Sequence, residues 1–246
     1  MLFDFTHLQI FLIALIFIWS GFVRSGLGFG GAALGLPLML LVYNKPVFWL
    51  PIIGMHLLFF SALTLRTRFK NVAWPYLFRT MIIIVPTTII GVFGLISLPN
   101  TVMVIFIYAV TLFYAVMWMF NITIHSSNRW IDRSLLGLGG YIAGTSLSGA
   151  PLIVAVYMKN IAREQLRNTL LVLWFVLVSI KMTTFVAFNI ELHLDIALLL
   201  IPVAAIGHVI GLKMHDLIMQ NDQLFKRIIG MALLLICMIG LWKVSN

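Results

Sequence analysis

The chain has 246 residues, of which 62% are hydrophobic and 9% are charged, and its formal net charge is +9. An apolar share so far above the usual value of about 45–50% excludes an ordinary soluble domain. The basic residues are spread over short loops, which argues against a nucleic-acid partner, and apolar runs of about 20 residues recur along the chain. We therefore expect an all-α polytopic membrane protein, multi-pass in the cell inner (plasma) membrane and in contact with the lipid bilayer.

The apolar segments follow one another in two similar sets. The first set opens with a long segment, Leu8–Tyr43, which Arg24 and several glycines interrupt. It continues with three predicted spans: Val47–Leu65, Trp74–Ile96 and Thr101–Phe120. After a polar linker, Asn121–Arg133, the second set opens with another interrupted segment, Ser134–Met158. It continues with three more predicted spans: Leu166–Phe188, Leu194–Leu212 and Leu224–Leu241.

The two interrupted segments resemble each other. A displacement of 118 positions brings together five identical residue pairs: Gly21 with Gly139, Gly26 with Gly144, Gly31 with Gly149, Ala32 with Ala150, and Leu34 with Leu152. A displacement of 116 positions also brings Pro86 onto Pro202 and Gly91 onto Gly207. These matches indicate an internal duplication within one membrane domain, with a first repeat over 1–125 and a second over 126–246. A chance alignment of apolar runs is the alternative.

The basic residues predict which loops share a face, because cytoplasmic loops gather Lys and Arg. Four loops hold most of them: Arg66, Arg68 and Lys70; Arg129 and Arg133; Lys159, Arg163 and Arg167; and Lys213, Lys226 and Arg227. If all four lie on one face, Ser134–Met158 must begin and end there, as a re-entrant hairpin with two arms of roughly 13 residues, each about 20 Å long. Each half is then one hairpin plus three crossing helices, and the second half is inverted relative to the first. If the interrupted segments cross fully instead, the basic loops are divided between the two faces.

Paired broken segments in corresponding halves indicate the binding site of a transporter. Glycine lets a ligand approach the backbone closely, and a helix N-terminus offers unpaired N–H groups and a positive dipole end to an anion. We therefore expect two hairpin tips near mid-membrane to hold a small anionic substrate between them. The candidate substrate-binding residues at these tips are Ser25, Gly28, Gly30, Gly31, Ser146, Ser148 and Gly149. Close helix packing is the alternative, and we favour it for Gly21, Gly26 and Gly139.

Charged and titratable residues inside the apolar segments are further candidates. Arg24 lies within an apolar run, where a charge is costly and usually marks function. It would pair with the substrate or line its vestibule, unless it snorkels to an interface. Lys181 and His208 are candidate substrate contacts, with snorkelling of the lysine and a structural hydrogen bond of the histidine as alternatives. All seven acidic residues fall in loops or at helix ends, so a buried carboxylate relay has no candidates, and we expect neither a cofactor nor a metal.

Three segments carry a resemblance to a known family: SGLGFGGAALGLPLML (Ser25–Leu40), SLSGAPLIVAVYM (Ser146–Met158) and IGHVIGLKM (Ile206–Met214). They resemble the sulfite exporter TauE/SafE family of membrane permeases. The resemblance implies a two-repeat carrier of sulfite, sulfonates or other organic anions. The second copy departs from the family pattern, because Ser146 and Ser148 stand where glycines are common, and Ala150 stands where a second proline is common.

The function predicted from these features is secondary transport, as an exporter, of a small sulfur-containing oxyanion such as sulfite or an organosulfonate. The alternatives are uptake instead of export, carriage of another small organic anion, and a role as an accessory or structural membrane subunit. A homodimer is a further expectation. The chain has no HExxH motif, no GxSxG motif and no pair of intramembrane acids. We therefore expect no enzyme.

Overall fold

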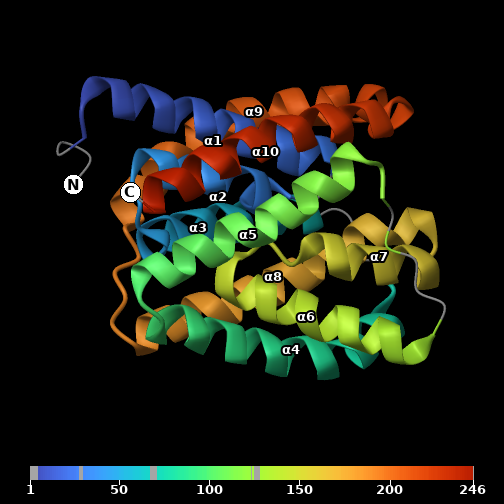
Figure 1. Cartoon of the computed structure of the whole chain (residues 1–246). Helices are drawn as coiled ribbons and strands as arrows, with labels where there is room; N and C mark the ends of the chain where they lie inside the picture. The colour runs from blue at the N-terminus through green and yellow to red at the C-terminus, as the bar shows by residue number, and fades with distance from the viewer. Residues whose placement is uncertain (1–4, 28–29, 67–70, 123, 125–127, 246) are drawn as a thin grey trace. The chain divides into compact units, whose positions relative to one another are not determined.

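The computed structural model describes residues 5–27, 30–66, 71–122, 124 and 128–245. These residues form ten helices and no strand (Figure 1). The helices are α1 (His7–Leu27), α2 (Gly31–Val42), α3 (Pro46–Leu65), α4 (Trp74–Ser97), α5 (Asn100–Met119), α6 (Arg129–Ser146), α7 (Ala150–Asn160), α8 (Arg163–Ala187), α9 (Leu194–Gln220) and α10 (Asp222–Ser245). In this described part, seven helices are long and apolar enough to cross a membrane: α1, α3, α4, α5, α8, α9 and α10. The predicted all-α, multi-pass membrane protein is confirmed.

The predicted segment bounds agree with the helices to within four residues except at two places. Helix α6 begins at Arg129 and not at Ser134, because the side chain of Asn128 accepts a hydrogen bond from the backbone N–H of Trp130 at 3.1 Å and caps the helix. Helix α9 continues past Leu212 to Gln220, because Ile218 is buried in an apolar cluster with residues of α1. The predicted linker and the predicted end of this span are therefore wrong by one to two helical turns.

The chain divides into two compact units, which we describe separately. Unit 1 consists of Met1–Trp49, Leu98–Thr123 and His193–Asn246, and it holds α1, α2, α5, α9 and α10. Unit 2 consists of Leu50–Ser97 and Ile124–Leu192, and it holds most of α3 together with α4, α6, α7 and α8. Each unit takes helices from both halves of the sequence, so the units are not the predicted repeats. The repeats over 1–125 and 126–246, and their inversion, stay predictions.

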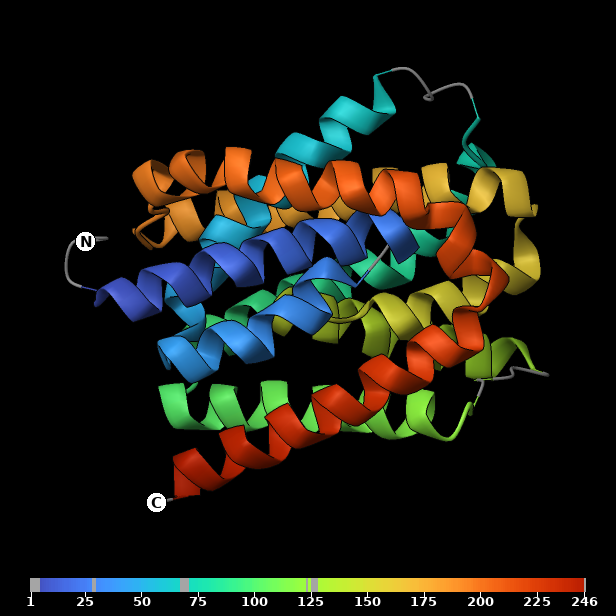
Figure 2. The same cartoon turned by 90° about the horizontal axis from the view of Figure 1, so that it is seen from above.

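In unit 1, the first interrupted segment is a hairpin of α1 and α2 (Figure 2). Gln9 at the start of α1 donates to the carbonyl of Val42 at the end of α2 over 3.4 Å. Near the tip, the hydroxyl of Ser20 donates to the carbonyl of Gly31 over 2.9 Å. A straight helix would separate residues 9 and 42 by about 50 Å. The segment therefore begins and ends on the same side of its unit.

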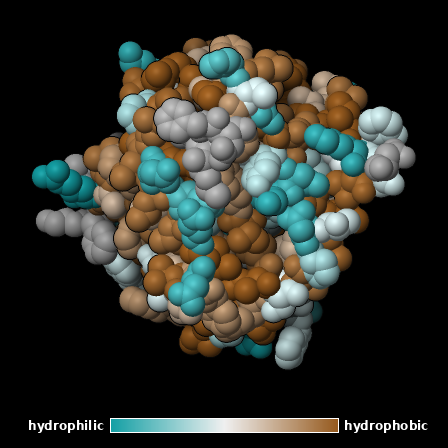
Figure 3. All heavy atoms as spheres, turned by 90° about the vertical axis from the view of Figure 1, so that its left-hand side faces the viewer, coloured by the Kyte–Doolittle hydropathy of each residue, from teal (hydrophilic) through white to brown (hydrophobic). Residues whose placement is uncertain are grey.

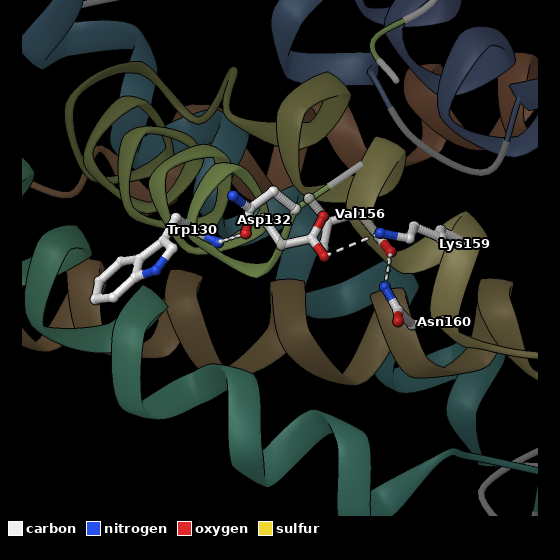
Figure 4. Close-up of polar contacts among 6 residues, drawn as sticks. Trp130, Asp132, Val156, Lys159 and Asn160 are labelled. Carbon is white, nitrogen blue, oxygen red and sulfur yellow. Dashed lines mark hydrogen bonds and ion pairs between the residues drawn. The ribbon is translucent and has the colours of Figure 1, made fainter. Parts of the chain in front are cut away.

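In unit 2, the second interrupted segment is a hairpin of α6 and α7. Lys159 near the end of α7 forms an ion pair of 3.2 Å with Asp132 in the first turn of α6 (Figure 4). The predicted hairpin is confirmed, but its two arms are unequal, with 18 residues in α6 and 11 in α7. The capped start at Arg129 lengthens the first arm.

Close contacts between backbones hold each hairpin to another helix of its own unit. A Cβ atom on Gly207 of α9 would overlap the carbonyl oxygen of Ile18 in α1. In unit 2, a Cβ atom on Gly91 of α4 would overlap the carbonyl oxygen of Tyr141 in α6. Glycines at such contacts allow two membrane helices to approach closely. The packing role predicted for three glycines is confirmed, since added Cβ atoms there would also meet neighbouring atoms: Gly21, Gly26 and Gly139.

The connections between helices gather at the ends of each unit. In unit 2, the side chain of Asn71 donates to the carbonyl of Glu164 over 3.0 Å, which joins the start of α8 to the connection before α4. With the Lys159–Asp132 pair, this contact brings the start of α6, the end of α7, the start of α8 and Asn71 to one end of unit 2. In unit 1, Asn100 donates to the carbonyl of Asn44 over 2.9 Å, so two loops predicted to lie on the opposite face meet each other. On the face drawn in Figure 3, groups of hydrophilic side chains lie between apolar ones.

Candidate functional site

The first break separates α1 from α2. Gly30 caps α2 with φ of 84°, in the left-handed region that favours glycine, while an added Cβ atom there would make only ordinary contacts, at 4.0 Å, with the side chains of Leu34 and Val23. Gly31 is different, because its Cβ atom would lie 2.8 Å from the carbonyl oxygen of Ser20 and 2.9 Å from the Cβ of Arg24. The first turn of α2 is thus pressed against the last turns of α1. Gly28, also predicted at this tip, lies outside the described residues.

The last two turns of α1 carry the polar groups of the first break. Arg24 is only 9% exposed, so it does not snorkel out of its unit. Ser25 is buried, and its hydroxyl is hydrogen-bonded to Nδ1 of His208 on α9. One residue later, the carbonyl of Gly26 lies 2.7 Å from Nδ1 of His215, also on α9. Helix α9 therefore brings two histidines to the C-terminal end of α1.

The second break separates α6 from α7. Leu147 follows α6 in the left-handed region, with φ of 58°, and its N–H donates to the carbonyl of Ala143 over 3.0 Å. This bond is the αL arrangement that ends many helices. Helix α7 then starts at Ala150 with a proline in its first turn. The break is sharp, although no glycine occupies the left-handed position.

The two serines of the second break are buried, and their hydroxyl hydrogens are engaged. Ser146 donates to the carbonyl of Ile142 over 3.0 Å, and Ser148 donates to the carbonyl of Ser146 over 3.2 Å. Each hydroxyl has one hydrogen, so donation to an anion would require it to turn. Gly149 packs against α6, because its Cβ atom would overlap the carbonyl oxygen of Gly139.

Lys181 of α8 brings a positive charge to the second break. Its side chain is 1% exposed, and Nζ donates to the carbonyls of Gly144 over 2.6 Å and Thr145 over 3.1 Å. These carbonyls belong to the last turn of α6, where helix carbonyls lack intrahelical partners. The lysine therefore does not snorkel, and it lies at the negative end of the α6 dipole.

A family model described as "Sulfite exporter TauE/SafE" matches residues 12–239, a range that runs through both hairpins. The chain belongs to the sulfite exporter TauE/SafE family. This is a family of membrane transporters, not of enzymes, and it implies membrane transport of sulfur anions such as sulfite. No curated protein and no solved structure matches the chain.

In this TauE/SafE protein, the candidate residues form one group in each unit. Around the first break, in unit 1, lie five of them: Arg24, Ser25, Gly30, Gly31 and His208. Around the second break, in unit 2, lie the other four that the structure describes: Ser146, Ser148, Gly149 and Lys181. The meeting of the two groups around one substrate stays a prediction. Among the described residues, no cluster of three or more His, Cys, Asp or Glu side chains is placed to hold a metal.

One residue that contacts a hairpin break of this TauE/SafE protein was not predicted from the sequence. His215 lies beyond Leu212, where the predicted span ends, and it reaches Gly26 only because α9 continues to Gln220. A signal was present, since His208 and His215 are seven residues apart and so lie on one face of a continuous helix.

Proposed function

We propose that this TauE/SafE protein is a secondary transporter of the cell inner membrane that exports a small sulfur-containing oxyanion, such as sulfite or an organosulfonate. The two hairpin breaks bind the anion near the middle of the membrane, and Arg24 and Lys181 supply the positive charge. No carboxylate is needed for this binding.

The observation that carries the proposal is the burial of the Lys181 side chain beside the second break. As an ammonium, Nζ has three N–H donors; the carbonyls of Gly144 and Thr145 accept two of them, and the third is the one that we assign to the anion. Moving a charge out of water costs several kcal/mol, and a negatively charged partner offsets this cost. Sulfite and sulfonate groups have several acceptor oxygens for such charge-assisted hydrogen bonds.

The hairpins contain almost no acidic residue that could balance this charge, so we assign that role to a ligand. Between His7 and Val42 the chain has no acidic residue. Between Arg129 and Asn160 the only one is Asp132, which pairs with Lys159 at the open end of the hairpin. Both breaks are thus basic in a membrane segment almost free of carboxylates, and this favours an anion over a cation as the substrate.

The membrane potential favours export over uptake. An anion leaving a cell with a negative interior gains about 2.3 kcal/mol per charge for each 100 mV. Export therefore needs no buried carboxylate relay, for which the sequence predicts no candidate.

Flux through the purified protein in liposomes tests the proposal. Vesicles loaded with labelled sulfite should release it faster than protein-free vesicles, and an inside-negative potential should speed the release. Arg24→Ala should slow release at least tenfold, and Gly30→Leu should do the same because leucine disfavours the left-handed backbone at that position. Absence of flux for sulfite, short alkyl sulfonates and small carboxylates alike would point to an accessory subunit. Sulfite flux unchanged in both variants would dismiss the first break as a binding site.

A further inference from the structure

The two breaks share a hydrogen-bonding feature that is not part of the family description: a side chain of another helix contacts a backbone carbonyl at the end of the first arm. The displacement of 118 positions that matches the two interrupted segments brings Gly26 onto Gly144. Both residues lie in the last turn of the first arm of their hairpin, in α1 and in α6. In each, the backbone carbonyl meets a nitrogen from the side chain of a different helix: His215 Nδ1 at 2.7 Å from the oxygen of Gly26, and Lys181 Nζ at 2.6 Å from the oxygen of Gly144.

The chemistry of these contacts fixes the direction of both hydrogen bonds. A carbonyl oxygen only accepts, so Nδ1 of His215 carries the hydrogen and donates it, as the lysine ammonium does. The last four carbonyls of a helix have no partner within it, and a side-chain donor placed there satisfies one of them and stabilises the last turn. In the first hairpin, this bond stabilises the last turn of α1, from which the chain continues to Gly30 and Gly31.

We infer that His215 is a positioning residue for transport, and that it does for the first break what Lys181 does for the second. This inference rests on the proposed function, because the break it positions is the proposed anion site. His215 acts through the backbone of α1 and need not touch the substrate itself. Its neighbour His208 bonds to a side chain, the hydroxyl of Ser25, and so holds the helix pair without capping a carbonyl.

Two substitutions separate a positioning role from simple stabilisation. His215→Asn keeps an N–H donor on the atom attached to Cγ, close to the place of Nδ1, whereas His215→Leu removes every donor. We expect the KM for sulfite in liposome flux to rise about tenfold in the leucine variant, with little change in kcat, and to stay within about twofold of wild type in the asparagine variant. The matched control is His7→Leu, which removes an exposed imidazole at the start of α1 and should leave KM unchanged.

A second measurement does not depend on transport. Amide hydrogen exchange over Val23–Leu27 should speed up in His215→Leu and remain at the wild-type rate in His215→Asn, because an uncapped last turn frays. If the leucine variant does not fold, His215→Ala takes its place in both measurements. Faster exchange with an unchanged KM would make His215 a structural cap only, and unchanged exchange would overturn the cap itself. If the wild-type protein moves no oxyanion, the proposed function fails, and the exchange rates still decide whether the cap exists.

Discussion

The basic side chain at the first break belongs to the hairpin itself, whereas the one at the second break comes from a neighbouring helix. Arg24 is part of α1, while Lys181 reaches the end of α6 from α8. The backbone turns also differ, because Gly30 takes the left-handed position in the first break and Leu147 takes it in the second. In both hairpins, a buried basic side chain lies near the break, where the first helix ends and the second begins. The two breaks therefore have the position of the basic side chain in common, although the residue and the helix that supply it differ.

The inversion of the two repeats predicts the largest effect, because each introduced cysteine should be labelled either fully or not at all from outside the cell. With Cys237 replaced by serine, single cysteines are placed at Asn44, in the loop after the first hairpin, and at Lys159, at the open end of the second. A membrane-impermeant maleimide added to intact cells should label Asn44→Cys and should label Lys159→Cys only after the cells are opened. Labelling of both positions from the same side would contradict the inverted arrangement.

A large effect on stability is expected where the hairpins contact their partner helices. Gly91→Ala should lower the free energy of unfolding by about 1–3 kcal/mol, because the new methyl group would overlap the carbonyl of Tyr141. The control is Gly94→Ala on the same helix, where the added Cβ would lie 3.4 Å from the hydroxyl of Tyr141. Thermal unfolding in detergent measures both.

The first hairpin offers the equivalent change, Gly207→Ala, whose methyl group would overlap the carbonyl of Ile18. We expect a loss similar to that of Gly91→Ala. A loss in only one of the two variants would show that the hairpins are not held in the same way.

The two left-handed turns should respond in opposite directions and more weakly. Gly30→Ala should cost about 1 kcal/mol, because a residue with a Cβ atom is strained at φ of 84°. Leu147→Gly should relieve strain of a similar size at φ of 58°, less the contacts of the leucine side chain. Unfolding midpoints that shift the same way in both variants would contradict these assignments.

Much of the fold could be predicted from the sequence, because the apolar runs of the spanning helices end at polar or proline residues. The distribution of Lys and Arg predicted that the second interrupted segment folds back, and the Lys159–Asp132 pair confirms it. The extension of α9 escaped prediction, because a window of apolar residues ends at Leu212 while the burial of Ile218 is a tertiary effect. The site was predicted as far as its residue types, including Arg24 and Lys181.

The hydrogen bonds that the residues of the site form could not be predicted. The sequence does not decide whether the hydroxyls of Ser146 and Ser148 donate to a ligand or to carbonyls of their own segment, as they do here. The carbonyls that Lys181 meets depend on how α8 packs against α6, and this too is decided by tertiary contacts.

Equilibrium binding of labelled sulfite to the purified protein tests most directly whether the buried charge at the breaks binds the anion. Lys181→Met removes the ammonium, and Lys159→Met makes the same change at an exposed lysine of the same unit. Loss of one buried charged contact is worth about 2–5 kcal/mol, so Kd should rise at least thirtyfold in Lys181→Met, while in Lys159→Met it should stay within about twofold, since exposed ion pairs contribute about 0–1 kcal/mol. Equal affinity of wild type and Lys181→Met for sulfite would contradict the account.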